Sequence, residues 1–336
     1  MSSTSLFPAN GKPSVLIVSP ARADANNGNW HTAARWARLL RRHFRIDVAE
    51  RWSGEPCDAL IALHARRSAP SIDAWAAAHP ERPLVVVLTG TDLYRDIRED
   101  AMAQRSLEQA TRLVVLQDQG LQELAPALRR KTSVIYQSAP RLAPAAPPRR
   151  TLTVVSVGHL RDEKDPLTFM RAAERLARRA DIRFEQIGSA LDPAFVAAAR
   201  RTEAANPRYR WLGGLPRPTT RQRIRRAHLL VNTSRMEGGA QVILEAVQSA
   251  TAVLASRIPG NLGMLGPDPA GGFDLGDDAG LARLIEQACD DRAWLTRLRA
   301  ETVARSPLFE PAEEERRLVE LIHGALAPTP SQAPTP

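Results

Sequence analysis

Short apolar runs alternate with longer amphipathic segments along almost the whole chain, and this alternation constrains the fold more than any other feature of the sequence. Short runs rich in Val, Ile and Leu indicate strands buried on both faces, whereas apolar residues spaced three or four apart indicate helices. In the first half, the predicted strands are 14–19, 46–49, 59–63, 84–88, 113–116 and 133–136, and the predicted helices are 30–42, 69–78, 100–109 and 119–129. Strands and helices in such alternation favour an α/β fold with a doubly wound parallel sheet.

The alternation is interrupted once, at residues 139–150, which contain four prolines and no periodic pattern. Such a composition is typical of a linker. We therefore predict a Rossmann-like domain over 1–138 and a second one over 151–310, followed by a closing helix at 311–327 and a disordered tail at 328–336. In the second half, the predicted strands are 152–157, 182–187, 209–212, 229–231 and 252–255, and the predicted helices are 166–179, 193–205, 219–226, 279–290 and 292–304.

The composition is that of a soluble globular protein, since 43% of the 336 residues are hydrophobic and 25% are charged. Two explanations fit the net charge of +9: solvated faces of arginine-rich helices, or a surface that attracts phosphorylated substrates or a membrane surface. Aromatic residues make up only 5% of the chain and no nucleic-acid-reading motif is present, so we expect no nucleic-acid partner.

Several sequence features point to a cytoplasmic protein. The first residues, Met1–Pro8, lack the basic start and the apolar stretch of a signal peptide. No apolar run approaches the ~20 residues that span a bilayer, so we expect no stable membrane insertion. The two cysteines, Cys57 and Cys289, fall in different predicted domains, which supports neither a disulfide framework nor a metal cluster.

Residues 232–246, which read Asn-Thr-Ser-Arg-Met-Glu-Gly-Gly-Ala-Gln-Val-Ile-Leu-Glu-Ala, hold the densest set of candidate binding groups. An apolar run precedes them and a helical pattern follows, so Gly238 and Gly239 are expected where a helix begins. Free backbone N–H groups and the positive end of the helix dipole would make that point an anion site. Glu237 would lie just before the helix and Glu245 eight residues later, a rise of roughly 12 Å, although two glutamates at this spacing also occur on solvated helices.

Polar residues also follow other predicted strands, at the sheet edge where ligands bind in doubly wound folds. In the second domain, residues 158–166 (Gly-His-Leu-Arg-Asp-Glu-Lys-Asp-Pro) follow the first strand. In the first domain, the residues at the ends of strands are Gly28, Asn29, His64, Arg66, Thr89, Thr91 and Asp92. We expect them to line shared pockets, with helix-capping loops and surface side chains as the simpler alternative.

The spacing of Glu237 and Glu245, with seven residues between them, resembles the donor-binding motif of the GT-B glycosyltransferases of family 4, and Lys164 matches the lysine of that family's phosphate loop. The resemblance implies the GT-B fold, in which two doubly wound Rossmann-like domains face each other across a cleft and the last helix crosses back to the first, acceptor-side domain. It implies that Glu237 holds the sugar of a nucleotide sugar, that Glu245 holds its ribose, and that Lys164 neutralises the departing diphosphate. The other donor-side positions that it implies are Gly28, Asn29, Gly158, His159, Gly238, Gly239 and Ala240.

The sequence departs from the family pattern at several positions. Gly238–Ala240 stands where the family has Gly-Phe-Gly, which alters the expected contacts with the sugar. His159 takes the place of the family's arginine, and we expect Arg161 to supply the lost charge. Thr89 takes the place of a histidine, so the acid/base role of that histidine does not carry over. Residues 256–263 stand where the family has a glycine-rich loop that faces the sugar.

The sequence contains no Asp-x-Asp motif for a divalent metal ion. The charge of the leaving group would then be met by Lys164, Arg161 and helix N-terminal amides. We therefore expect a metal-independent transferase with no cofactor, for which the UDP-sugar is a co-substrate.

Four segments together resemble one branch of family 4, the selenosugar synthases of selenoneine biosynthesis: 20–30, 62–68, 88–94 and 158–166. The resemblance implies that selenophosphate is joined to the sugar of UDP-N-acetylglucosamine or UDP-glucose through a carbon–selenium bond, after which phosphate is lost. Because selenophosphate is already an anionic and polarisable nucleophile, it needs no strong general base. His64, Arg66 and Arg67 are candidates for holding its phosphoryl oxygens, unless the two arginines are ordinary surface residues.

Two other functions are open at this point. One is a family 4 glycosyltransferase with a hydroxyl acceptor, such as a lipid or polysaccharide, docked through the arginine-rich helix at 30–42. The other is a nucleotide-sugar binder without catalytic activity. The preferred sugar, the stereochemistry at the anomeric carbon and the oligomeric state do not follow from the sequence.

Overall fold

The computed structural model describes residues 11–20, 28–145, 148, 150–190 and 192–327. The expectations for Met1–Pro8, for residues 21–27 of the loop after the first strand and for the tail at 328–336 therefore lie outside the described residues. Two compact units make up the described chain. Unit 1 contains the residues up to Ile135 together with those from Ala312 onward, and unit 2 contains Tyr136–Pro311.

Unit 1 is built on a six-stranded parallel sheet with the strand order β2-β1-β3-β4-β5-β6. Its strands are β1 (Ser14–Val18), β2 (Arg45–Ala49), β3 (Ala59–Leu63), β4 (Leu84–Leu88), β5 (Arg112–Val115) and β6 (Thr132–Val134). Its helices are α1 (Gly28–Leu40), α2 (Ala69–Ala78), α3 (Ile97–Glu99), α4 (Ala101–Gln109), α5 (Pro126–Arg129) and α13 (Pro311–Leu326).

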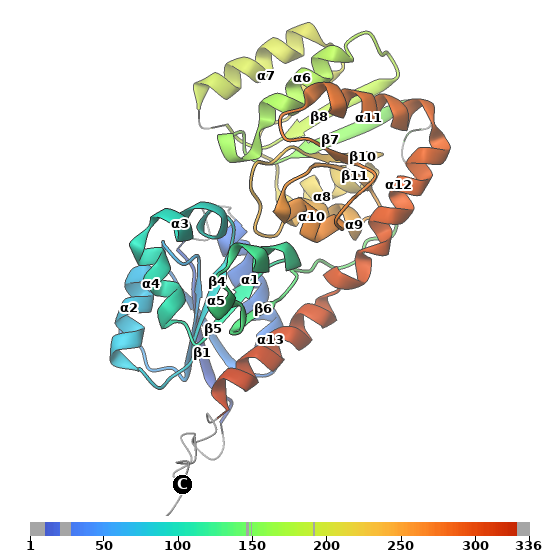
Figure 1. Cartoon of the computed structure of the whole chain (residues 1–336). Coiled ribbons are helices and arrows are strands. Elements are labelled where there is room, and N and C mark those ends of the chain that lie inside the picture. Colours follow the sequence, from blue (N-terminus) through green and yellow to red (C-terminus); the bar gives the residue numbers. More distant parts are fainter. Residues whose placement is uncertain (1–10, 21–27, 146–147, 149, 191, 328–336) are drawn as a thin grey trace, which may run out of the picture. The chain divides into compact units, whose positions relative to one another are not determined.

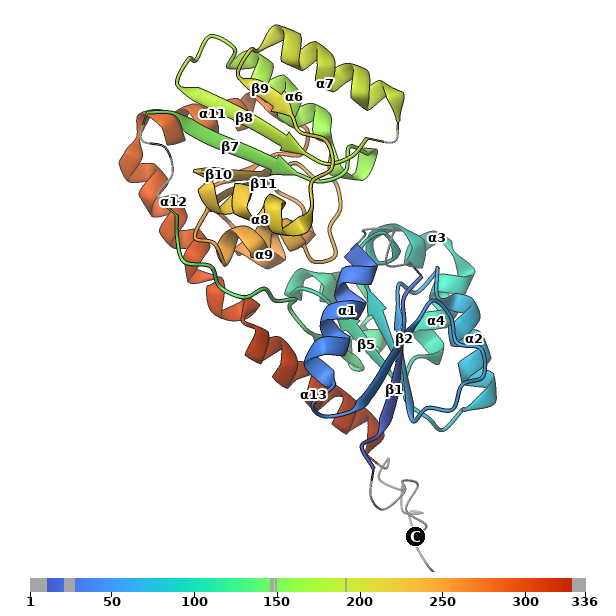
Figure 2. The ribbon, with the colours of Figure 1, turned by 180° about the vertical axis from the view of Figure 1, so that it is seen from behind.

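Helices cover both faces of the unit 1 sheet, as Figures 1 and 2 show. On one face, α1 and α13 contribute Trp36 and Leu318 to a common apolar cluster. On the other face, α2 and α4 contribute Ile72 and Leu107. Every residue of β3 and β4 is buried, which explains why these strands appear in the sequence as unbroken apolar runs.

Unit 2 repeats this plan with a six-stranded parallel sheet in the order β12-β11-β10-β7-β8-β9. Its strands are β7 (Leu152–Val157), β8 (Ile182–Ile187), β9 (Tyr209–Trp211), β10 (Leu229–Asn232), β11 (Ala252–Ser256) and β12 (Gly272–Phe273). Its helices are α6 (Pro166–Arg175), α7 (Pro193–Ala205), α8 (Arg217–Arg226), α9 (Gln241–Val247), α10 (Pro259–Leu265), α11 (Asp278–Asp290) and α12 (Arg292–Ala304).

The two faces of the unit 2 sheet carry different sets of helices. The cluster that contains Phe169 and Ile285 packs α6, α7, α11 and α12 against one face. The cluster that contains Ile224 and Ile243 packs α8, α9 and α10 against the other, and Figure 1 shows these three helices together on that side. Strand β7 has β8 on one side and β10 on the other, so the chain reverses its direction of winding between β7 and β10. Such a switch point is where doubly wound folds bind ligands.

The predicted α/β class with two doubly wound parallel sheets is confirmed, and the structure corrects several elements. The helix predicted at 119–129 is a 3₁₀ segment, Asp118–Glu123, followed by the short α5, because Ala125 adopts the extended conformation that a following proline favours. The loop expected at 256–263 is largely helix α10, which has Pro259 in its first turn, where a proline is tolerated. None of the described helices has both the length and the apolar character needed to cross a bilayer.

The change from unit 1 to unit 2 falls between Ile135 and Tyr136, a few residues before the segment expected to be the linker. The start of that segment is bound to unit 2 by backbone hydrogen bonds. Ala139 donates its N–H to the carbonyl oxygen of Phe309 at 3.3 Å, and Leu142 donates to that of Gln248 at 2.8 Å. Residues 146, 147 and 149 lie outside the described residues.

Candidate functional site

Two loops meet at the switch point of unit 2, one after β7 and one after β10, because these strands pair directly. The loop after β7 contains a 3₁₀ turn, Asp162–Lys164. Thr233 Oγ1 donates to the carbonyl oxygen of Lys164 at 2.8 Å. The backbone N–H of Arg235 donates to the carbonyl oxygen of Glu163 at 2.9 Å. The two loops are therefore held together as one surface.

Lys164 and Glu237 form an ion pair at this point, with 2.6 Å between Lys164 Nζ and Glu237 Oε1. Ser234 Oγ donates to the same carboxylate oxygen at 2.6 Å, and Asn232 Nδ2 lies 3.4 Å from it. Burial by itself would raise the pKa of Glu237, but the Lys164 ammonium and these hydrogen bonds outweigh it and hold that pKa below its ordinary value. The Lys164 side chain is 24% exposed, so its charge can reach a ligand.

Two glycines that the sequence reasoning did not single out allow the site loops to pack closely. A Cβ atom on Gly188 would lie 1.8 Å from the carbonyl oxygen of Gly158, and the φ of +150° also favours glycine. A Cβ atom on Gly260 would lie 2.0 Å from the carbonyl oxygen of Glu237. The predicted Gly158 is different, because a Cβ atom there would meet only the Lys164 side chain, at 3.5 Å.

The structure changes the expected geometry around the motif at 232–246. Helix α9 begins at Gln241 with Ala240 as its N-cap, so Gly238 and Gly239 lie in the loop before the helix, and Glu237 precedes the helix altogether. The expected rise of roughly 12 Å along one helix therefore does not describe this pair of glutamates.

Glu245 lies on α9 and is only 3% exposed. Arg217, at the start of α8, donates to its Oε1 atom from both Nε, at 3.0 Å, and Nη2, at 2.9 Å. This pair fixes the direction of the Glu245 carboxylate. No pattern in the sequence indicates Arg217, because it lies 28 residues before its partner.

Four predicted donor-side residues lie outside the Lys164–Glu237 ion pair and the hydrogen bonds that hold Glu237. Arg161 and His159 are exposed, and Arg161 Nε lies 3.8 Å from Glu163 Oε2. The backbone N–H of Lys164 donates to the carbonyl oxygen of Arg161 at 2.9 Å, but within the described part of the chain the Arg161 side chain forms no hydrogen bond or ion pair with Lys164 or Glu237. Gly28 and Asn29 were expected in a loop, but they are the first two residues of α1.

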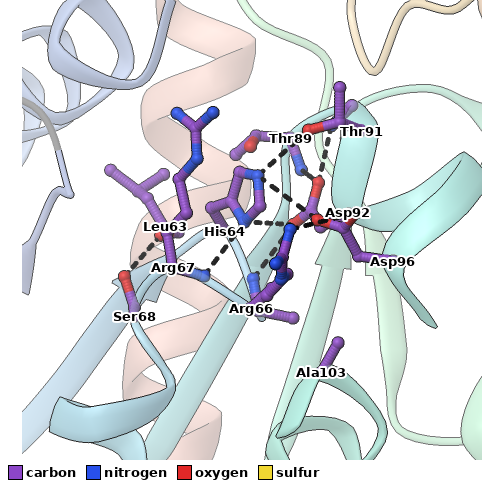
Figure 3. Close-up of polar contacts among 12 residues, drawn as sticks. Leu63, His64, Arg66, Arg67, Ser68, Thr89, Thr91, Asp92, Asp96 and Ala103 are labelled. Atoms are coloured by element: carbon purple, nitrogen blue, oxygen red, sulfur yellow. Dashed lines mark hydrogen bonds and ion pairs between the residues drawn. The ribbon is translucent and has the colours of Figure 1, made fainter. Parts of the chain in front are cut away.

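Unit 1 carries a second group of predicted residues, after β3 and β4, which are neighbouring strands (Figure 3). Asp92 is fully buried and accepts the backbone N–H groups of Thr89 and Gly90 at 2.9 and 2.8 Å on Oδ1. Its other oxygen accepts the N–H of Ala65 at 3.0 Å. Asp92 therefore ties the two loops together, which makes it a positioning residue.

His64 lies at the centre of this group and has a positive φ of 72°, which is uncommon for a residue other than glycine. Its Nε2 atom lies 3.1 Å from Thr91 Oγ1, and its Nδ1 atom accepts the backbone N–H of Arg67 at 3.3 Å. Carboxylate oxygens of Asp92 and Asp96 each lie 3.9 Å from a ring nitrogen. Burial lowers the pKa of His64 and outweighs the opposing effect of Asp92, so the ring is neutral near pH 7.

The two arginines that follow His64 are both on the surface. Arg66 Nε lies 2.7 Å from Asp100 Oδ2, and the Arg66 side chain is 49% exposed. Arg67 is exposed and extends away from the carboxylates in Figure 3.

Among the described residues, Asp181, Cys289 and Asp290 form a group with the atom types and spacing of metal ligands. Arg179 donates hydrogen bonds to both carboxylates of this group. Asp181 immediately precedes β8, whereas Lys164 lies in a loop that follows a strand. The group therefore lies at the opposite edge of the sheet from Lys164.

Comparisons with known proteins agree with the fold. The sequence profile of the family described as "Glycosyl transferases group 1" matches residues 151–291, which lie within unit 2. The structure of Anabaena HepE in complex with UDP is similar, with a TM-score of 0.72 and 16% identity over 93% of this chain and 100% of HepE.

Two further solved structures have the same architecture. Sucrose-phosphate synthase of Thermosynechococcus elongatus has a TM-score of 0.74 and 16% identity over 93% of this chain and 98% of that enzyme. The α,α-trehalose-phosphate synthase (UDP-forming) of Burkholderia xenovorans has a TM-score of 0.65 and 14% identity over 87% and 77% of the two chains. The chain thus has the GT-B fold, and its residues 151–291 match the model of the family described as "Glycosyl transferases group 1".

Proposed function

We propose that this protein transfers the sugar of a UDP-sugar, either UDP-N-acetylglucosamine or UDP-glucose, to the selenium of selenophosphate without a metal ion. The observation that carries the donor half of the proposal is the Lys164–Glu237 contact at the switch point of unit 2. The similarity in fold to HepE, whose structures contain UDP and UDP-glucose, supports a UDP-sugar as the donor.

The residues at the switch point suit a departing nucleoside diphosphate. The Lys164 ammonium is placed to stabilise the negative charge that grows on the diphosphate as the bond to the sugar breaks. Glu237, held by Ser234 and Asn232, offers a fixed carboxylate for the hydroxyl groups of the sugar. Glu245, oriented by Arg217, offers a second carboxylate for the ribose.

The acceptor half of the proposal rests on the resemblance to selenosugar synthases and on the group around His64. A neutral His64 does not have to remove a proton from selenophosphate, because this nucleophile is already anionic. Arg66 and Arg67 offer two positive charges next to it. The carbon–selenium bond forms as the bond between the sugar and UDP breaks, and water then cleaves the selenium–phosphorus bond to release phosphate and the selenosugar.

One observation favours a second candidate, a glycosyltransferase with a hydroxyl acceptor. His64 has Asp92 and Asp96 carboxylates 3.9 Å from its ring nitrogens, and carboxylates so placed can stabilise the cation that forms when a histidine accepts a proton from a hydroxyl group. In that case, replacement of His64 by Ala would abolish transfer. If selenophosphate is the acceptor instead, His64→Ala should retain most of the wild-type transfer rate.

The test is to incubate the purified protein with each UDP-sugar and selenophosphate in the presence of EDTA, and to analyse the products by mass spectrometry. Our proposal predicts a selenium-containing sugar, recognisable by its isotope pattern, together with equal amounts of UDP. Release of UDP only with a hydroxyl acceptor would support the second candidate. Binding of UDP without release of UDP from any donor would identify a non-catalytic nucleotide-sugar binder.

A further inference from the structure

Unit 2 contains a cavity of about 660 Å³ between helix α8 and the strands β7 and β8. Its lining includes Thr153, Arg183, Glu185, Gln222, Arg223 and Arg226. Thr153 and Arg183 are the second residues of β7 and β8, whereas the candidate-site loop that holds Lys164 follows the last residue of β7. At about 3.3 Å per residue, the two positions on β7 are separated by roughly 13 Å. The cavity is therefore a different site from the one that holds Lys164.

The lining of this cavity carries an excess of positive charge, because three arginines face one carboxylate. Glu185 is only 4% exposed, and Arg223 Nη1 lies 3.1 Å from both of its oxygens. Arg183 Nε lies 3.3 Å from Glu185 Oε1, so a single negative charge is shared by these two arginines. Arg226 is exposed, and it takes part in no ion pair within the part of the chain that the structure describes.

His228 is a buried neighbour of the cavity-lining residue Thr153. The Nδ1 atom of His228 accepts the backbone N–H of Thr153 at 2.9 Å, which places His228 beside the cavity wall. The pKa of His228 is lowered to about 4 by burial and, to a smaller extent, by Arg292 and Arg299.

We propose that this cavity binds a small phosphorylated metabolite, with its phosphate among Arg183, Arg223 and Arg226. Guanidinium groups match the geometry of phosphate oxygens, and several of them around one anion give the tight, directional contacts typical of phosphate sites. Pockets for small molecules usually have volumes of about 300 to 1,000 Å³, so this cavity has room for a sugar or a three-carbon unit next to the phosphate. The hydroxyl of Thr153 and the amide of Gln222 provide the polar contacts for that uncharged part.

The test uses calorimetric titration of the full chain with glucose 6-phosphate, 3-phosphoglycerate and pyrophosphate, in the presence of saturating UDP. Saturation with UDP keeps the probes from the nucleotide site. We expect glucose 6-phosphate, 3-phosphoglycerate or both to bind at submillimolar to millimolar concentration and more tightly than pyrophosphate. Glucose, which lacks the phosphate, should not bind. Arg226→Glu should weaken this binding by at least about tenfold, since it removes a charged contact and adds a repulsive one.

The matched control is Arg201→Glu, at an exposed arginine on α7 in the same unit. It changes the net charge equally and should bind the metabolite like the wild type. Thermal melting and UDP affinity should be unchanged in both variants, which shows that each is folded. Equal metabolite binding by Arg226→Glu and the wild type would overturn the proposal. So would the absence of binding by either metabolite at millimolar concentration.

Discussion

The contact between Lys164 and Glu237 couples the two residues most directly placed to handle the donor, and it can be tested one side chain at a time. Lys164→Ala removes the charge that would stabilise the leaving diphosphate, and it leaves the Glu237 carboxylate buried without its partner. We expect kcat/KM for UDP-sugar to fall by about 100-fold to 1,000-fold, a loss typical of removing one preorganised charge or donor from a transition state.

The measurement is the rate of UDP release by Lys164→Ala, Glu237→Gln and the double variant. Because the two side chains are in contact, the effects of the single changes should not add. Lys131→Ala, at a lysine of unit 1 that binds backbone carbonyl oxygens, is the control and should keep its rate. Wild-type turnover in Lys164→Ala would remove this lysine from the mechanism.

Arg217 should affect binding of the donor indirectly, by orienting the Glu245 carboxylate. Arg217→Ala frees the carboxylate to rotate, which should weaken its hydrogen bonds with a ribose. We expect KM for the UDP-sugar to rise by about tenfold with a smaller change in kcat, as is typical when a binding contact is lost. The affinity ratio between UDP and 2′-deoxy-UDP should also fall. An unchanged ratio would mean that Glu245 does not read the ribose.

Protonation of His228 should lower the stability of the folded protein in acid. Its Nδ1 atom accepts the N–H of Thr153, which only the neutral ring can do, and burial lowers its pKa to about 4. An unfolded histidine titrates near about 6.5, so the unfolded state takes up this proton first as the pH falls. The contribution of His228 is therefore complete above pH ~6.5, declines from there to pH ~4, and amounts to about 3 kcal/mol.

Urea unfolding at a series of pH values measures this effect. His228→Asn keeps an acceptor near the same position but cannot titrate, so the free energy of unfolding of this variant should depend less on pH between ~6.5 and ~4. If the wild type and His228→Asn lost stability equally over that range, another group would be responsible.

At the scale of elements, the sequence predicts strands better than loops, for a physical reason. Strands such as β3 and β4 are buried on both faces, and their apolar runs are visible without knowledge of any neighbour. Helix α10 was missed because three glycines and a proline within 259–266 indicate a turn in isolation. In the folded protein its glycines allow close packing, since a side chain on Gly260 would collide with the backbone of Glu237.

In the candidate site, too, the sequence predicts residues that belong to a local pattern better than residues whose role depends on a distant partner. The family resemblance directed attention to Lys164, Glu237 and Glu245, which carry charges at recognisable spacings. It did not indicate Arg217 or Ser234, whose roles depend on contacts that appear only when the chain has folded. It also suggested a pocket contact for Asp92, whereas both carboxylate oxygens of Asp92 accept backbone N–H groups.

The close contact between Gly260 of helix α10 and the site loop can be tested by substitution. Gly260→Ala would place a Cβ atom 2.0 Å from the carbonyl oxygen of Glu237, so either α10 or the site loop must move. We expect a loss of about 1 to 3 kcal/mol of stability, the usual cost of overpacking, together with weaker UDP binding. Gly324→Ala on α13 is the matched control, since a Cβ atom there has no neighbour within 4 Å. Normal UDP affinity in Gly260→Ala would show that α10 does not define the loop.

At the scale of the whole molecule, the chain closes unit 1 with its last helix. Helix α13 contributes Leu318, Leu321 and Ile322 to a cluster that also contains side chains from α1 and the sheet of unit 1. Unit 2, with its own two clusters, is formed entirely from residues between the two parts of unit 1. The core of unit 1 therefore requires both ends of the described chain, whereas Lys164, Glu237 and Glu245 all lie in unit 2.

Glu314 is the buried polar residue through which helix α13 contacts α1. The Glu314 carboxylate, which is buried, accepts hydrogen bonds from Trp36 Nε1 at 2.7 Å and from Arg35 Nε at 3.0 Å. Glu314→Ala leaves the buried Arg35 guanidinium without this counter-charge, so we expect unit 1 to lose about 3 to 5 kcal/mol. The exposed Glu320→Ala on the same helix should cost no more than about 1 kcal/mol.

Calorimetric unfolding measures the stability of each unit, and UDP titration measures the donor site. Glu314→Ala should lower the unfolding temperature of unit 1, while UDP affinity, measured well below that temperature, should match the wild type because Lys164, Glu237 and Glu245 all belong to unit 2. UDP should raise the unfolding temperature of unit 2 in both proteins, since a ligand stabilises the folded unit that binds it. Loss of UDP affinity in folded Glu314→Ala would show that the donor site depends on unit 1.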